Sequence, residues 1–362
     1  MDRTIDKPLL VAILFLLGGG FLILASASLA VSQKNFGTLY YYSLRQLATG
    51  VLPGVAAFLV TMHIHYRTWK KYALPLMILS FVLLALVFIP EISFSAGGAR
   101  RWLHFGPVSF QPSEIMKLSF IMYLASWLDA RRKEIGSVPY GMVPFMVMLA
   151  LVSIFLVMQP DIGTLGVIVA TAGILYFLSG GRISQIATLI LFCLVVFYFV
   201  VQLAPYRLHR ILVFLNPSLD PQGIGYQINQ AFIAIGSGGF WGTGFGRGLQ
   251  KYSYLPEPLN DSIFAVFAEE MGFLGSAFLL FFFLFLFWRG MTIAKSAPDM
   301  FGRLLAGGIS IGILVQAFIN MAAISGLLPL TGIALPFVSY GGTSLVVTLV
   351  ASGILLNISK YT

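Results

Sequence analysis

Long apolar runs recur along the whole of this 362-residue chain, and they limit its possible folds more than any other feature of the sequence. Each run is about 20 residues long, the length that an α-helix needs to cross the hydrocarbon core of a bilayer. Only 10% of the residues are charged, whereas a typical soluble domain has about 25%. Backbone polar groups in lipid must find partners within the protein, which favours helices as the spanning elements. We therefore predict an all-α polytopic membrane protein with one integral membrane domain over 1–362.

The apolar pattern predicts about ten transmembrane helices and one long connection. The expected helices cover about 8–30, 46–63, 71–90, 112–130, 140–158, 163–180, 184–203, 262–288, 303–325 and 335–358. The connection between the seventh and eighth helices covers about 204–261, and we expect it to be functional because loops of this length are uncommon in compact domains. Its segment "RLHRILVFLNP" (207–217) places cations beside an apolar run. This pattern predicts a helix lying in the membrane interface, with an ordinary loop helix as the alternative.

The distribution of Lys and Arg between the predicted spans indicates the orientation, because cytoplasmic loops carry more cations. With the N-terminus in the cytoplasm, thirteen cations lie inside and eight outside. Those inside are Arg3, Lys7, Arg67, Lys70, Lys71, Arg131, Arg132, Lys133, Arg182, Arg289, Lys295, Arg303 and Lys360; those outside are Lys34, Arg45, Arg100, Arg101, Arg207, Arg210, Arg247 and Lys251. We therefore predict that both termini are cytoplasmic and that the long loop is extracytoplasmic. Loop charge also accounts for the net charge of +9, so no nucleic-acid partner is expected.

The outside cations are more numerous than this bias predicts, and most fall in two places. Arg100 and Arg101 precede the fourth span, whereas Arg207, Arg210 and Lys251 lie in the long loop. Because they stand on the less favoured side, we expect these cations to bind an anion. Thiol and histidine metal sites are not expected, since the chain has one cysteine and four scattered histidines.

Acidic residues gather near the predicted outer end of the spans. Asp261 stands at the junction of the long loop and the eighth span, and Glu269 and Glu270 lie further along that span. Charged residues within spans are costly and often functional. A structural role is the alternative for the two glutamates. Asp261 can also cap its helix, which is compatible with catalysis because both roles need the side chain exposed at the helix end.

Two further polar groups lie at the outer ends of other spans. Glu114 and Lys117 in "FQPSEIMKL" are three residues apart, so they share a helical face and can pair. Gln159 and Asp161 belong to "QPDIG", the outer turn between the fifth and sixth spans. The first pair can also serve only to lock helix packing, and Asp161 can serve as a turn residue or a helix cap. With Ser339 of "LPFVSYGGTS", these residues are expected to be the polar groups of the cavity.

The glycine-rich segment "GSGGFWGTGFGRG" (236–248) does not meet the requirements of a nucleotide site. No predicted strand precedes it, and no Gly-Lys-Ser/Thr sequence follows it. We therefore expect close backbone packing or a mobile loop, both of which favour glycine.

Five segments resemble, in order along the chain, the SEDS family of bacterial cell-wall polymerases, which act in shape, elongation, division and sporulation. They are "GGARRW", "FQPSEIMKL", "QPDIG", "NPSLDPQGIGYQINQAFIAIGSGGFWGTGFGRGLQKYSYLPEPLNDSIFAVFAEEMG" and "LPFVSYGGTS". Within the family, "GLQKYSYLPEP" is more similar to the division branch than to the elongation branch. The family's essential aspartate corresponds to Asp261. Its usual histidine and threonine before that position are Leu259 and Asn260 here, and its usual aromatic after it is Ser262.

The resemblance implies a peptidoglycan glycosyltransferase in the bacterial cytoplasmic (inner) membrane. Such an enzyme links lipid II, a disaccharide-pentapeptide on undecaprenyl pyrophosphate, into glycan strands on the outer face of the membrane. The implied partners are a class B penicillin-binding protein that crosslinks the product and other membrane proteins of the divisome or elongasome. Asp261 would take a proton from the acceptor hydroxyl. A divalent cation, Mg²⁺ or Mn²⁺, is the candidate cofactor. The pyrophosphate-binding cations would be Arg100, Arg101, Arg207, Arg210 and Lys251.

Two other functions stay open at this point. A lipid II flippase would need a polar path across the bilayer and cationic sites at both leaflets, whereas the polar residues here gather at the outer end. A non-catalytic scaffold that recruits a transpeptidase is the second alternative, and the departures at 259, 260 and 262 are its support.

Overall fold

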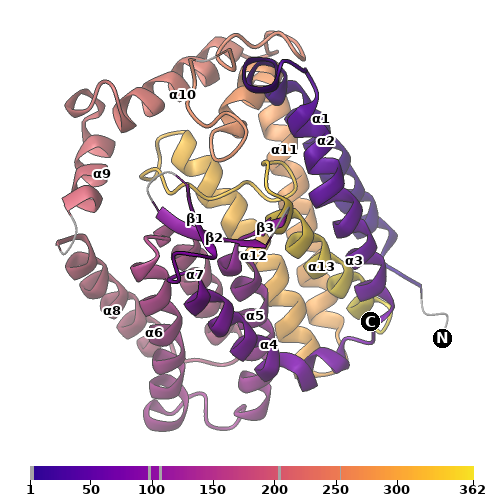
Figure 1. Cartoon of the computed structure of the whole chain (residues 1–362). Helices are drawn as coiled ribbons and strands as arrows, with labels where there is room; N and C mark the ends of the chain where they lie inside the picture. Colours follow the sequence, from indigo (N-terminus) through magenta and orange to yellow (C-terminus); the bar gives the residue numbers. More distant parts are fainter. Residues whose placement is uncertain (1–3, 97–98, 106–107, 203–204, 253) are drawn as a thin grey trace.

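A computed structural model describes residues 4–96, 99–105, 108–202, 205–252 and 254–362. The chain forms a bundle of long helices with a small sheet (Figure 1). The elements are α1 (Lys7–Phe36), α2 (Tyr41–Gln46), η1 (Leu47–Val51), α3 (Leu52–His63), α4 (Arg67–Leu86), β1 (Ser93–Ala96), β2 (Ala99–Phe105), β3 (Val108–Phe110), α5 (Pro112–Ala130), η2 (Val138–Met142), α6 (Val143–Met158), α7 (Ile162–Leu178), α8 (Ile183–Gln202), α9 (Pro205–Leu215), η3 (Pro217–Leu219), α10 (Ile224–Gly238), α11 (Ile263–Ser296), α12 (Met300–Ile324) and α13 (Gly342–Ser359).

The predicted spans are confirmed in number and approximate place. Within the described ranges, 8 helical segments are long and apolar enough to cross a membrane, and α5 and the shorter apolar α7 bring the set to about ten. The two largest boundary errors are the end of α11, at Ser296 rather than near 288, and the start of α13, at Gly342 rather than near 335. The segment before it is apolar but not helical, because it contains Pro336 and the left-handed Phe337 (φ 65°).

A three-stranded antiparallel sheet precedes α5, and the helix-based interpretation of the sequence did not predict it. The strand order is β1-β2-β3, and Leu103 of β2 pairs with Ser93 on one side and Phe110 on the other. The sheet contains Arg100 and Arg101 on β2. It therefore gives a defined backbone to a cationic segment that was expected to be a loop.

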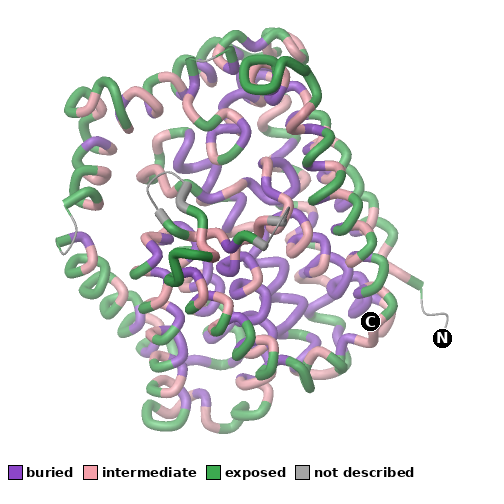
Figure 2. Tube along the Cα trace, viewed as in Figure 1, coloured by how far each residue is buried: buried purple, intermediate pink, exposed green. Residues whose placement is uncertain are grey.

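The core is centred on α12, which is largely buried by its neighbours. Small residues allow this close packing, as is usual between membrane helices. A Cβ on Gly308 of α12 would lie 2.7 Å from Ile121 and 2.8 Å from Leu175, and one on Gly290 of α11 would lie 1.9 Å from the Ser310 hydroxyl. Figure 2 shows the buried trace in the middle of the bundle and exposed residues on its outer helices, notably α8. We interpret these apolar outer faces as lipid-facing.

Both termini lie at the same end of the bundle (Figure 1). The backbone N–H of Asp6 donates to Ser359 Oγ (3.0 Å), and the Asp6 carboxylate pairs with Arg289. The other end carries α9, α10 and the start of α11. This arrangement agrees with an even number of spans. It also separates the predicted cytoplasmic charges from the long loop.

The predicted orientation can be tested with single cysteines in a Cys193→Ser background. Arg132 and Gln222 are both exposed and lie at opposite ends, whereas Lys251 is buried and cannot report. In intact spheroplasts, a membrane-impermeant thiol reagent should label Gln222→Cys and leave Arg132→Cys unlabelled until the membrane is permeabilised. Labelling at 132 without labelling at 222 would mean that the chain is inverted.

Candidate active site

Asp261 lies in the turn before α11, and its main chain is anchored to other elements. The carbonyls of residues 259–261 all accept hydrogen bonds. Their donors are, in chain order, the Tyr340 N–H (2.8 Å), Ser339 Oγ (2.6 Å) and Asn320 Nδ2 (2.9 Å). Three consecutive peptide groups are thus fixed by α12 and by the segment before α13. Ser339, which was expected to be a polar group of the cavity, therefore holds the backbone of the Asp261 turn.

The N-cap of α11 is Ser262, not Asp261, and its side chain makes no capping hydrogen bond. The Ser262 hydroxyl is buried and accepts instead from Gln227 Nε2 of α10 (3.0 Å). The Asn260 amide donates to the Glu257 carboxylate (2.6 Å). Ser262 and Asn260, two of the residues that depart from the family pattern, thus each make a side-chain hydrogen bond beside Asp261.

The carboxyl group of Asp261 is strongly desolvated and incompletely hydrogen-bonded. Its Oδ1 is buried without a partner among the residues that the structure describes. Burial, followed by the nearby charge of Glu257, raises the pKa of Asp261 to about 6, although hydrogen bonds from Gln227 and from the Asp261 and Ser262 N–H groups lower the pKa in part. A carboxylate that titrates in this range is suited to accept a proton near neutral pH.

Arg210 of α9 lies close enough to feel the charges of both Arg101 and Asp261. Burial lowers the pKa of Arg210, the charge of Arg101 lowers it further, and the charge of Asp261 raises it. Among the described residues, the hydrogen bond of Arg210 is a long one, 3.5 Å, from Nη1 to the Leu330 carbonyl. Arg101 donates to the backbone carbonyls of Gln159 (3.3 Å) and Pro160. Arg101 and Arg210 thus bring two positive charges to the region of Asp261 and Glu257, where they can interact with an anion.

The other three predicted cations lie differently. Arg207 donates to the carbonyls of Val157 (3.0 Å) and Val200 (2.8 Å), so it ties α9 to α6 and α8. Arg100 is exposed and lies beside Arg101 on β2, where the register between β1 and β2 shifts. Lys251 is fully buried in an ion pair with Glu270 (2.6 Å). In this conformation, Arg101 and Arg210 are the predicted cations that the structure brings together with Asp261.

Glu114 and Lys117 form the ion pair that their spacing predicts. Lys117 Nζ lies 2.8 Å from Glu114 Oε2 and also donates to Gln316 Oε1 of α12 (2.5 Å). Both charged side chains are about nine-tenths buried. They line a cavity of about 50 Å³ between α5, α7, α12 and α13. The pair therefore lies inside the bundle and bridges two of its helices through Gln316.

Gln159 and Asp161 organise the turn between α6 and α7. Asp161 is the N-cap of α7, because its Oδ1 accepts from the Thr164 N–H (3.3 Å), which confirms the capping interpretation. Its Oδ2 accepts from Ser113 Oγ (2.9 Å) at the start of α5. The Gln159 side chain donates to the Leu84 carbonyl (2.8 Å). Both side chains thus connect the outer ends of neighbouring helices.

A break at Gly272 divides α11, and the glycine-rich loop fills it. Gly272 has φ 65° and ψ −165°. The N–H groups of Phe273 and Leu274 donate to loop carbonyls at 2.9 and 3.2 Å, and the Glu269 and Glu270 carbonyls accept from loop N–H groups at 3.0 Å each. A Cβ on Gly242 would lie 2.2 Å from the Glu270 carbonyl oxygen. Close backbone packing, one of the two roles expected for the glycines, is confirmed.

The two glutamates hold this loop with their carboxylates as well as their carbonyls. Glu269 Oε1 accepts from the Leu249 N–H (2.7 Å), and Glu270 Oε2 accepts from the Gly246 N–H (2.9 Å). In the described conformation they are occupied by the protein itself, in line with the structural alternative. The backbone groups at the helix break thus have hydrogen-bond partners within the protein, as buried backbone groups require.

Three residues of the site were not predicted from the sequence. Gln316 and Asn320 are four residues apart on α12, so a polar pair on one face of an apolar span was a usable signal. Gln227 had no comparable signal, because its partner Ser262 comes from a distant turn. Among the described residues, no group of three His, Cys, Asp or Glu side chains is arranged to hold a metal ion.

Comparison with known proteins agrees with these features. A family model for FtsW, RodA and SpoVE, described as cell cycle protein, matches residues 7–362. Stage V sporulation protein E of Bacillus subtilis is 42% identical over 356 residues, covering 98% of this chain and 97% of that protein. "Probable peptidoglycan glycosyltransferase FtsW" of Geobacter metallireducens is 43% identical over 340 residues, covering 94% and 90%.

Solved structures resemble the whole chain. A chain of a peptidoglycan synthase complex, described as coordinating polymerization and crosslinking, has a TM-score of 0.81, 26% identity and 99% coverage of both chains. The rod shape determining protein RodA of Thermus thermophilus has a TM-score of 0.70, 26% identity and coverage of 98% and 97%. With a family match over 7–362 and relatives above 40% identity along most of its length, the chain belongs to the FtsW/RodA/SpoVE family, the SEDS family that its motifs resemble.

Proposed function

We propose that this protein is a peptidoglycan glycosyltransferase that polymerises lipid II at the outer face of the cytoplasmic membrane, with Asp261 as its base. The enzyme class follows from the family and from the names of relatives 43% identical over most of the chain. The observation that carries the residue assignment is the desolvated Asp261 carboxyl near Arg210, which in turn lies near Arg101, at the end of the bundle away from the termini. Both termini would then be cytoplasmic, as the loop charges predict.

The chemistry needs a proton acceptor and a site for a leaving diphosphate. Asp261 would take the proton from the acceptor sugar hydroxyl as its oxygen attacks the anomeric carbon of the donor. The bond from that carbon to the lipid pyrophosphate breaks, and negative charge grows on the leaving group. Arg101 and Arg210 are the cations placed to stabilise it. Arg100, exposed on the same strand, is available to a second headgroup.

A divalent cation is compatible with the donor set at this site. Mg²⁺ is commonly held by one or two carboxylates together with substrate phosphates. Asp261 and Glu257 lie close enough for their charges to interact, and Asp261 Oδ1 has no partner among the described residues. Glu257, together with the diphosphate oxygens, would hold the ion, which would supply positive charge to the diphosphate while the Asp261 carboxylate stays free to accept the proton.

We further propose that a class B penicillin-binding protein, with other division or elongation membrane proteins, works beside this enzyme. The support is the likeness to a chain of a complex that coordinates polymerization with crosslinking. Identity of 42–43% to FtsW and SpoVE relatives, against 26% to RodA, favours a role in division or sporulation over elongation.

The charge distribution favours a polymerase over a flippase. At the terminal end, several cations are in ion pairs, such as Arg67–Asp299 (2.8 Å) and Lys70–Asp129 (2.5 Å). At the other end, Arg101 and Arg210 have backbone carbonyls as their hydrogen-bond partners. A flippase would need comparable anion sites at both ends.

Purified protein supplied with labelled lipid II, with and without its cognate transpeptidase, provides the direct test. Glycan strands longer than a disaccharide are expected, and gel separation of the product would detect them. Movement of lipid II between leaflets of a vesicle without strand formation would favour the flippase. Neither activity, in protein that still binds the transpeptidase, would favour the scaffold.

The acid limb of the pH–rate profile should report Asp261. Its pKa is raised to about 6, and only the deprotonated form can accept a proton, so kcat/KM should fall about tenfold per pH unit below 6. Folding has the opposite dependence: because the folded pKa exceeds the ordinary 3.8, this carboxyl favours folding below about pH 4 and that contribution is lost as the pH rises through 6. Glu257→Gln removes a neighbouring charge and should move the limb to lower pH. An unmoved limb in both Glu257→Gln and Asp261→Asn would assign it to another group.

A further inference from the structure

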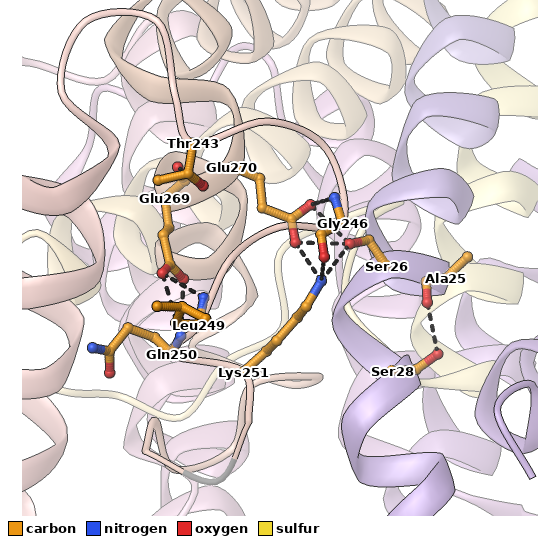
Figure 3. A network of polar contacts seen from close by, with 10 residues as sticks. All are labelled: Ala25, Ser26, Ser28, Thr243, Gly246, Leu249, Gln250, Lys251, Glu269 and Glu270. Carbon is orange, nitrogen blue, oxygen red and sulfur yellow. Dashed lines mark hydrogen bonds and ion pairs between the residues drawn. The ribbon is translucent and has the colours of Figure 1, made fainter.

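Lys251 belongs to a buried cluster that the proposed chemistry does not use. Its ammonium donates to Ser26 Oγ (3.0 Å), the Gly246 carbonyl (2.9 Å) and Glu270 Oε1 (2.6 Å), so all three of its donors are occupied (Figure 3). Ser26 Oγ lies 2.8 Å from each oxygen of Glu270. We call Ser26, Lys251 and Glu270 the clasp.

The clasp closes the stretch of chain that carries Asp261. Lys251 and Glu270 are 19 positions apart, and Asp261 stands midway between them. Glu269 reinforces the closure, because its carboxylate accepts from the N–H groups of Leu249 (2.7 Å) and Gln250 (3.3 Å). Holding the two ends of a loop together reduces the conformations open to the residues between them. Asp261 is therefore confined by a contact that lies far from it along the chain.

Ser26 ties the closed loop to a membrane helix. It is buried on α1, and α1 packs on the second half of α11, where Phe15 stacks on Phe282 with ring centroids 3.9 Å apart. The clasp thus sits where α1, the glycine-rich loop and the first half of α11 meet (Figure 3). A shift of α1 relative to α11 would be transmitted directly to both ends of the Asp261 segment.

Stability alone is a weak reason for such a cluster. Two charges without solvent contact incur a desolvation penalty that their attraction often fails to exceed, and well-packed apolar residues can replace such pairs without loss. A fixed relative position of three segments is what directional hydrogen bonds supply and apolar contacts do not. The full burial of Lys251 also keeps it from a headgroup.

We propose that the clasp positions Asp261 for catalysis, and that Lys251 and Glu270 act through the backbone without touching the substrate. The proposal rests on the role of Asp261 proposed above. It reassigns Lys251 from a candidate diphosphate ligand to a positioning residue.

The kinetic test uses Lys251→Met, Glu270→Gln and the double variant, with Lys70→Met as the matched control. Lys70 also pairs with one acid, Asp129, but its side chain is 45% exposed and lies at the opposite end. In the single clasp variants, kcat per folded molecule should fall about 10²-fold, because a misplacement of about 1 Å can have that effect, while KM for lipid II stays within about threefold. The double variant should regain thermal stability, since no charge is left unpaired, yet keep the low kcat. Lys70→Met should keep its kcat.

Spin labelling gives a readout that does not depend on activity. A nitroxide on Tyr254→Cys, in a Cys193→Ser background, reports on an exposed position inside the closed segment. Its mobility should rise in Lys251→Met and in Glu270→Gln. This result would stand even if Asp261→Asn proved active, so failure of the base assignment can be told apart from failure of the clasp.

Three outcomes would overturn the proposal. A tenfold rise of KM in Lys251→Met with kcat retained would make Lys251 a substrate ligand. Wild-type kcat per folded molecule in the double variant would reduce the cluster to a stability role. If the single variants do not fold, Ser26→Ala removes the hydrogen bonds of Ser26 to Lys251 and Glu270 without leaving a charge unpaired. Unchanged kcat and unchanged label mobility in that variant would also contradict the clasp.

Discussion

Replacing Asp261 with asparagine is expected to lower the rate of glycan polymerisation about 10²–10⁴-fold while the protein remains folded. Asparagine is nearly isosteric with aspartate, but it cannot accept a proton at neutral pH. The turn should survive, because the anchors on residues 259–261 bind backbone carbonyls and not the carboxylate. The rate is measured from glycan strands made from lipid II, at equal amounts of folded protein and with the same transpeptidase.

Asp220→Asn is the matched control, because it makes the same change in the same long loop. Asp220 Oδ1 accepts from the Gly223 N–H and Oδ2 from the Ile224 N–H (2.9 Å each) at the start of α10, and asparagine keeps one of these two acceptors. It should polymerise within a few-fold of wild type. Asp261→Asn activity at that level would exclude Asp261 as the base, and loss of activity through unfolding would leave the assignment unsupported.

Breaking the Glu114–Lys117 pair should produce a large loss of stability. The side chains are 8% and 11% exposed, so removing one partner leaves a buried and poorly compensated charge, at a cost of about 3–5 kcal/mol. Glu114→Gln leaves the hydrogen bond from Lys117 to Gln316 in place, whereas Lys117→Met removes it. Glu114→Gln and Lys117→Met should therefore each destabilise strongly, and the double variant should lose less than the sum of the two.

The measurement is a double-mutant cycle on unfolding in detergent, with polymerisation followed in parallel. Arg131 and Glu134 provide the control cycle, because they have the same i,i+3 spacing at the end of α5 but are 49% and 45% exposed. Exposed pairs of this kind are worth about 0–1 kcal/mol. Strict additivity in the Glu114–Lys117 cycle would show that the buried pair does not interact.

The spans could be predicted from the sequence because a transmembrane helix is a local property of about 20 residues. The same locality explains the errors. The hydropathy of α11 does not reveal the break at Gly272. The groups that compensate for the break are backbone N–H and carbonyl groups of the loop at 239–244, which hydropathy does not report. High hydropathy also extends into the apolar stretch before α13, where Pro336 and Phe337 prevent a helix. The sheet was missed although Gly-Gly in "GGARRW" is a recognised hairpin signal.

The candidate site divides in the same way. Asp261 could be singled out from its place at a helix mouth and from its family match. The roles of the cations could not, because composition does not reveal which ones have partners. Lys251 and Arg210 are both cations of the long loop in the sequence. In the structure, Lys251 is buried in an ion pair with Glu270, whereas Arg210 donates a long hydrogen bond to the Leu330 carbonyl. Only the tertiary structure distinguishes a cation used by the fold from one available to an anion.

The anchoring of Asp261 through main-chain carbonyls bears on how the site can evolve. Every residue has the same carbonyl group, so Tyr340, Ser339 and Asn320 can hold the turn whichever side chains stand at 259 and 260. Positions beside the aspartate are thereby released from the task of orienting it. They can drift between lineages, as the leucine and asparagine of this chain illustrate, or be varied in a mutant library that seeks altered acceptor preference. Ser339 and Asn320, in contrast, donate through their side chains, so such a library should leave these two residues in place.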